Sequence, residues 1–129
     1  MKYSYSKSTN LSFQEAIEKV KEELTKEGFG VLTEIDIKAT LKEKLNIDFD
    51  NYVILGACNP PFAHKSLLAE KEIGLFLPCN VIVYEEDGKT VVSTIVPSVQ
   101  MSMIENKELK SISGEVEDGL KKVIDSLPS

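Results

Sequence analysis

Two cysteines and one histidine are the residues best suited to chemistry in this chain of 129 residues. Cys58 and Cys79 flank His64 in the sequence, and two sulfurs with an imidazole suit zinc or copper(I). A thiolate beside a histidine would instead make a reactive cysteine, with Cys58 as the nucleophile and His64 as its base. The same three residues are therefore compatible with a metal site and with a thiol-dependent enzyme.

Each of these residues also has a purely structural explanation. A free cysteine is among the most often buried residues and packs like a small apolar side chain. A disulfide between Cys58 and Cys79 would need their Cα atoms to lie within about 7 Å. A lone histidine is commonly a surface or hydrogen-bonded residue, and Asn59 and Asn80 are simply explained as a helix cap and a hydrogen-bonding residue at a strand start. The spacing leaves these alternatives open.

Charge and composition exclude some classes of partner. The net charge is -6, every one of the 15 cationic residues is lysine, and tryptophan is absent. A chain without arginine, the usual bidentate reader of phosphate and guanine, is not expected to bind nucleic acid. No apolar run reaches the ~20 residues that span a membrane, and the start of the chain lacks a signal-peptide pattern. We therefore expect a cytoplasmic protein with reduced thiols.

The pattern of apolar residues predicts one domain over residues 1–129, without a linker or a repeat. A strand over Lys2–Ser6 is followed by a capping box from Ser12 to Glu15, which opens a helix that Gly28 ends as a left-handed cap. Apolar residues at helical spacing predict a last helix from about Leu109 to Leu127.

Four further strands are predicted between these two helices. Alternation over residues 31–37 predicts a half-buried strand, on which Glu34 and Asp36 would share a face as paired carboxylates or as a solvated edge. The other strands are expected near residues 52–58, 81–84 and 91–96, the last two joined as a hairpin. Short helices are expected over residues 38–45 and from Asn59 to about Lys71.

The predicted order β-α-β4-α makes a two-layer α+β sandwich with a mostly antiparallel sheet and short helical insertions. If the strand that ends at Cys58 lies antiparallel beside the strand that begins at Cys79, both thiols fall at one end of the sheet. His64 then lies on the helix that begins between them. The predicted ligand or thiol site at this end comprises Cys58, Asn59, His64, Cys79 and Asn80.

Three blocks of this sequence resemble a known family. They are Gly28–Asp36, Leu55–His64 and Leu77–Val81, and in this order they are similar to the domain of unknown function 302 family. The signature positions that match are Cys58, Asn59, Pro60, His64, Pro78, Cys79 and Asn80. The resemblance implies a TATA-binding-protein-like topology, commonly as a homodimer, in small prokaryotic proteins, and it implies no established activity.

Three functional hypotheses follow. The first is a dimeric binding module that takes a small molecule or a soft metal, with Cys58, His64 and Cys79 as the candidate ligands. The second is a thiol-dependent enzyme with Cys58 as its nucleophile. The third is a structural homodimer without a ligand, in which the same residues pack or cap. No phosphate loop, zinc-protease motif or EF-hand pattern is present, so the sequence identifies no cofactor.

Overall fold

The structure is a computed structural model that describes residues 2–129, and it contains a five-stranded antiparallel sheet in the order β1-β5-β4-β3-β2. Its strands are β1 (Ser4–Thr9), β2 (Gly30–Asp36), β3 (Tyr52–Cys58), β4 (Cys79–Glu86) and β5 (Lys89–Ile95). The helices are α1 (Phe13–Lys26), α2 (Ile37–Leu45), α3 (Pro60–Ala69), α4 (Pro97–Gln100) and α5 (Lys107–Asp125), with 3-10 turns η1 (Lys71–Phe76) and η2 (Met101–Met103). This order confirms the predicted α+β sandwich and its helical insertions.

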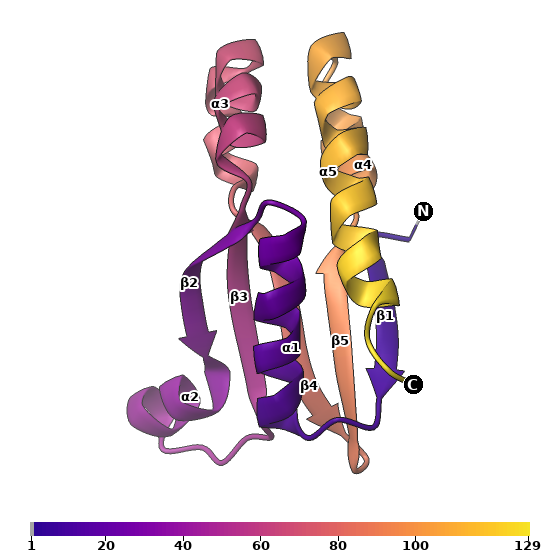
Figure 1. Ribbon diagram of the computed structural model, residues 1–129. Coiled ribbons are helices and arrows are strands. Elements are labelled where there is room, and N and C mark those ends of the chain that lie inside the picture. Colours follow the sequence, from indigo (N-terminus) through magenta and orange to yellow (C-terminus); the bar gives the residue numbers. More distant parts are fainter. Residues whose placement is uncertain (1) are drawn as a thin grey trace.

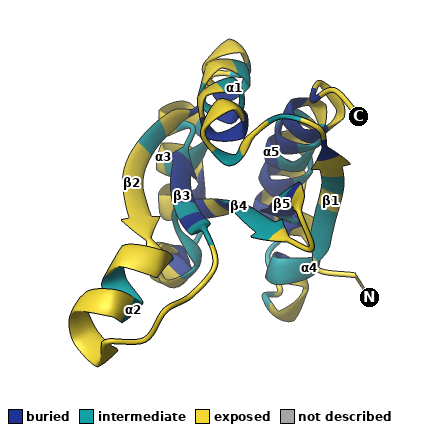
Figure 2. Cartoon of the chain, turned by 90° about the horizontal axis from the view of Figure 1, so that it is seen from below, coloured by how far each residue is buried: buried dark blue, intermediate teal, exposed yellow. Residues whose placement is uncertain are grey.

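Helices α1 and α5 lie on the same face of the sheet, which we call the covered face (Figures 1 and 2). They bury a core whose main members come from three strands and both helices, including Val20, Leu24, Leu55, Val81, Val83, Val92, Leu120 and Ile124. Helix α3 extends beyond the end of the sheet and lies beside α5 (Figure 1). Within residues 2–129, no helix is long and apolar enough to cross a membrane.

Helix α1 has the ends that the sequence predicts. The Ser12 side chain accepts a hydrogen bond from the backbone N–H of Glu15, whose carboxylate accepts one from the backbone N–H of Ser12. At the other end Gly28 has a φ of 83°, and the Phe29 amide donates to the Leu24 carbonyl. This Schellman-type arrangement turns the chain directly into β2.

Strand β2 corrects the prediction of a half-buried strand. The register shifts between Val31 and Thr33, so Leu32 is bulged and the two flanking residues face opposite sides of the sheet. As an edge strand with this bulge, β2 is largely exposed. Its carboxylates do not form a pair, because Glu34 binds the Lys21 ammonium at 2.7 Å and Asp36 accepts from the amide that opens α2.

Boundaries differ at two further elements. Strand β1 begins at Ser4 rather than Lys2 and continues to Thr9, because β5 pairs with it over that whole length. Helix α3 ends at Ala69, and a 3-10 turn carries the chain on through Gly74. The β4–β5 hairpin is as predicted, with positive φ angles of 52° and 77° at its two turn residues, Asp87 and Gly88.

Gly56 lies where the sheet has no room for a side chain. A Cβ atom at this position would lie 2.2 Å from Thr33 Oγ1 and 2.7 Å from Pro78 Cγ. Thr33 is its neighbour on β2, and Pro78 immediately precedes β4, after a cis Leu77–Pro78 peptide bond. The absence of a side chain at Gly56 therefore lets β2, β3 and the segment before β4 pack closely together.

We predict that Gly56→Ala destabilises the protein by about 1–3 kcal/mol, because the added methyl group overpacks this contact. Thermal unfolding should show a Tm lower by roughly 4–12 °C. Gly30→Ala on the neighbouring strand is the matched control, since a Cβ there meets nothing within 4 Å. Equal melting temperatures for the two variants would contradict the packing described at Gly56.

Candidate functional site

The pairing of β3 with β4 brings the two cysteines to one end of the sheet. Ala57 lies opposite Cys79, and Cys58 lies opposite Gly30 on β2. This confirms that both cysteines belong to the same sheet end, and both are free thiols. Side chains alternate along a strand, so Ala57 and Cys79 face the covered side while Cys58 is directed to the other side.

A pocket of about 40 Å³ lies at this end, between the sheet, α3 and α5. Its walls include apolar side chains of α3 (Phe62), of α5 (Ile112 and Val116), of η2 (Met101) and of the segment before β2 (Phe29). Cys79 lines it, Cys58 borders it at the strand end, and none of the residues described around it is charged. At about 10–15 Å³ per enclosed water, the pocket has room for roughly three water molecules.

The polar groups around the pocket are mostly occupied. Ser66 Oγ donates to the Phe62 carbonyl at 2.8 Å, and Ser113 Oγ donates to the Lys110 carbonyl at 3.0 Å. Both hydroxyls therefore satisfy carbonyls of their own helices rather than presenting a free hydrogen to the pocket. Asn59 is the remaining polar side chain that lines it.

Asn59 acts as the helix cap that its position before Pro60 predicts. Its Oδ1 accepts from the Phe62 amide at 3.5 Å, a long cap bond, at the start of α3. Its Nδ2 lies beside Gly28, where a Cβ atom would come within 3.2 Å of it. Asn59 thus joins the end of α1 to the start of α3 and fixes one wall of the pocket.

Cys79 is only 7% exposed. Burial, together with the nearby Cys58, raises the pKa of the Cys79 thiol from 9.0 to about 11. The thiol therefore stays protonated at neutral pH, where it behaves as a small apolar side chain rather than as a nucleophile. Because its folded-state pKa is raised, the stability it contributes is complete below pH 9 and declines as the pH rises through about 11.

His64 is not brought to the thiols. Helix α3 turns Phe62, Ala63 and Ser66 toward the pocket, whereas the exposed His64 follows Phe62 by two positions, about 200° around the helix. Across residues 2–129, no three His, Cys, Asp or Glu side chains are placed to hold a metal ion. The structure therefore does not bring Cys58, His64 and Cys79 together, because the sheet and the helix direct their side chains apart.

Asn80 also lies away from the pocket. It pairs with Gly56 across β3 and β4, and its side chain is exposed on the side opposite Cys79. Of the five predicted site residues, the structure places Cys79 and Asn59 at the pocket and Cys58 at its border. His64 and Asn80 are exposed elsewhere.

Sequence reasoning missed most of the pocket walls. Ile112 and Val116 belong to the apolar stripe of α5, and Phe29 follows the cap of α1. An apolar stripe on a helix is expected whether its residues pack against the sheet or line a pocket. The stripe of α5 therefore does not indicate which of its residues border the pocket. Residues of α5 that pack on the sheet differ from those that line the pocket only because α3 lies beyond the end of the sheet.

The family profile described as "Domain of unknown function DUF302" matches residues 5–127. The chain belongs to the DUF302 family. It is also similar to the crystal structure of an uncharacterized conserved DUF302 protein from Bacillus stearothermophilus, with 34% sequence identity and a TM-score of 0.91. The alignment covers 97% of this chain and 98% of that chain. Among curated proteins, none matches this DUF302 chain.

We predict that iodoacetamide alkylates Cys58 well before Cys79 in the folded protein, because Cys79 is buried and protonated. Mass spectrometry of Cys58→Ser and Cys79→Ser variants across pH 7 to 10 reads each thiol separately. His64→Ala should leave the rate at Cys58 unchanged. Fast alkylation of Cys79 near neutral pH, or a slower Cys58 in His64→Ala, would contradict the geometry of the site.

Proposed function

We propose that this DUF302 protein is a binding module for a small uncharged molecule, held in the pocket at the Cys58/Cys79 end of the sheet. The observation that carries the proposal is an apolar, uncharged pocket formed where the family's signature segments meet. Leu77–Cys79, Ala57–Asn59 and the first turns of α3 all contribute to it. Pockets that bind small molecules are typically apolar with a few placed polar groups.

The lining defines the chemistry of the ligand. A charged group entering this pocket would lose its hydration without gaining a counter-charge, which costs several kcal/mol even after relaxation. An apolar molecule loses little on entry, and the Asn59 side chain and the Cys79 thiol supply weak polar contacts. The volume of about 40 Å³ favours a ligand of a few heavy atoms.

The thiol-dependent enzyme has less support than the binding module. Cys58 is the half-buried thiol and stands beside the start of α3, so it remains the candidate nucleophile. Its proposed base, His64, is on the exposed side of that helix. Pro60 and Pro61 also remove two amides from the helix start, which leaves fewer donors for a thiolate.

We also propose that the protein is a homodimer and that it works in the cytoplasm. Its two free thiols fit a reducing compartment. The dimer follows from the family resemblance, and the uncharged strand surface described in the next subsection is consistent with it. A structural homodimer without a ligand is the outcome if the pocket binds nothing.

Xenon is a suitable probe for the pocket because it is apolar and small. We predict saturable amide shifts at Ala57, Cys79 and Ser113 when ¹⁵N-labelled protein is placed under xenon pressure. Ala63→Leu should abolish these shifts by filling the pocket, and Ala39→Leu on exposed α2 is the matched control that should retain them.

Ala63→Leu could disturb folding, because leucine is larger than the alanine it replaces. Ile112→Ala avoids this problem, because it makes a side chain of the pocket wall smaller. It enlarges the same pocket, so xenon should bind it more tightly than the wild type. Wild-type protein without saturable shifts at these amides, or with shifts that survive Ala63→Leu, would contradict the binding-module proposal.

A further inference from the structure

The sheet face opposite α1 and α5 carries an uncharged apolar surface. We call it the outer face and define its centre by Ile35, Tyr52, Ile54, Ile82, Tyr84 and Val91, which the strand registers place on the same side. Serines of β1 continue it on one flank. Within the strands, the charged residues on this side are Glu86 and Lys89, which lie next to the hairpin turn.

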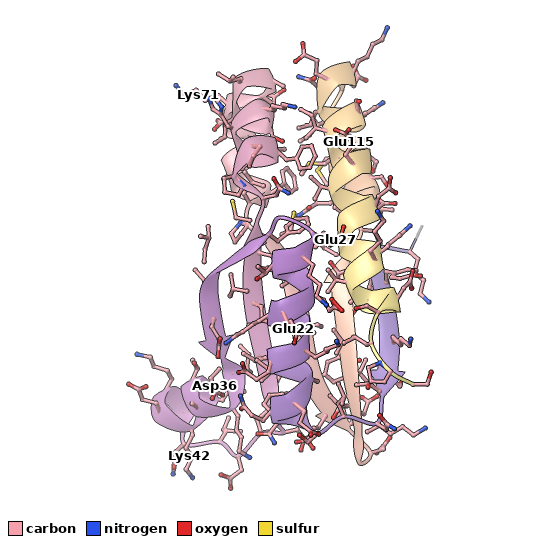
Figure 3. The ribbon with its side chains drawn as sticks, viewed as in Figure 1. Glu22, Glu27, Asp36, Lys42, Lys71 and Glu115 are labelled. Atoms are coloured by element: carbon pink, nitrogen blue, oxygen red, sulfur yellow. The ribbon has the colours of Figure 1, made fainter. Side chains whose placement is uncertain are left out.

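Most charges of the chain lie elsewhere. Glu22 and Glu27 project from α1 and Glu115 from α5, all in the helical layer (Figure 3). The Lys21–Glu34 ion pair lies on the covered side of β2, because α1 supplies its lysine. With 28% charged residues and a net charge of -6, a sheet face almost free of charge is a marked segregation. Depletion of charge with retained tyrosine is typical of the core of a protein interface.

The side chains of the outer face form a continuous surface. Ile54 pairs with Ile82, and below them the rings of Tyr52 and Tyr84 stack with centroids 5.4 Å apart. Phe49 extends this aromatic group beyond the strand, with its centroid 6.4 Å from that of Tyr52. Burial of Tyr52, with the phenols of Tyr84 and Tyr3, raises the pKa of its hydroxyl above the ordinary value.

We propose that the outer face binds the outer face of a second copy of this chain, which makes it the interface of the homodimer proposed above. The inference rests on that dimeric form and names where the two copies meet. Contact through this face leaves α1 and α5 of each copy, with their charges, pointing away from the partner. Two chains of charge -6 thus approach through their least charged surfaces.

A second copy fits this surface better than other partners do. Nucleic acids and anionic membranes require clustered cations, and the outer face holds one lysine at its end. A twofold dimer needs a self-complementary patch, and an uncharged apolar face meets that need against itself. The Ser6 and Ser93 hydroxyls share a hydrogen bond of 2.6 Å, so this part of the face can be buried with its polar groups paired.

The size of the face is adequate for a stable dimer. Five strands spaced ~4.8 Å apart, over seven residues at ~3.3 Å each, cover a footprint of roughly 550 Å² before side-chain relief. The exposed Phe49 adds to it from the loop before β3, where its ring lies beside that of Tyr52. Over two partners this footprint is about 1,100 Å², which clears the roughly 1,000 Å² in total that a specific interface needs.

Sedimentation equilibrium of the wild type and two lysine variants tests the proposal. The wild type should be a dimer at micromolar concentration. Ile82→Lys places like charges near the centre of the interface and should raise the dimer Kd by at least about 30-fold. Leu75→Lys is the matched control, because Leu75 is 82% exposed on η1, which packs against α3 rather than within the strands, and the variant should stay dimeric.

A monomeric wild type, a fully dimeric Ile82→Lys, or a Leu75→Lys that dissociates equally would overturn the interface. If circular dichroism shows that Ile82→Lys does not fold, the interface is tested on the wild type instead. Isotope-filtered NMR of a mixture of labelled and unlabelled wild-type chains detects contacts between the two copies. Intermolecular contacts among Ile54, Ile82 and Tyr84 support the interface, and their absence in a dimer overturns it. Each copy holds its own pocket, so the monomeric Ile82→Lys variant should still show the xenon shifts. Xenon binding therefore tests the binding module independently of the dimer interface.

Discussion

The antiparallel pairing of β3 with β4 fixes where almost every other feature of this protein can lie. Its register sets Ala57 opposite Cys79, Gly56 opposite Asn80 and Ile54 opposite Ile82. Because side chains alternate across a sheet, this one register assigns each pair to the covered face or to the outer face. A slip of a single residue would bury Asn80 and expose Cys79. Close packing of Thr33 and Pro78 over Gly56 opposes such a slip.

Two surfaces of different chemistry follow from that division. On the covered side, α1 and α5 bury most of the sheet, and α3 extends the helical layer past the sheet end, which leaves the small pocket beside Cys79. Among the described residues no long helix covers the outer side of the strands, and the charged strand residues on that side, Glu86 and Lys89, lie at the hairpin end. The family's signature residues are divided between these surfaces: Asn59 and Cys79 line the pocket, whereas Asn80 faces the outer side. A ligand in the pocket and a partner on the outer face therefore need not compete.

Local chemistry made much of this fold predictable. The capping box at Ser12, the left-handed Gly28 and the Asp87-Gly88 turn each specify a short segment without help from distant residues. The strand β2 was predicted, but its bulge and its exposure were not predictable, because a bulge at an edge depends on the partner strand. The directions of the side chains at the site were not predictable for a similar reason. Cys58 and His64 are close in sequence, yet strand alternation and helix rotation direct them apart, and both depend on where β3 ends.

The sheet directs the Cys58 and Cys79 side chains to opposite faces, and oxidation of the two thiols reports on this separation. Diamide treatment of the folded protein, followed by intact-mass analysis without reductant, should show no Cys58–Cys79 disulfide within one chain, because the two Cβ vectors point to opposite faces. The same treatment in denaturant should form that disulfide readily and provides the control. Rapid and complete formation of the intramolecular disulfide in the folded protein would contradict the account.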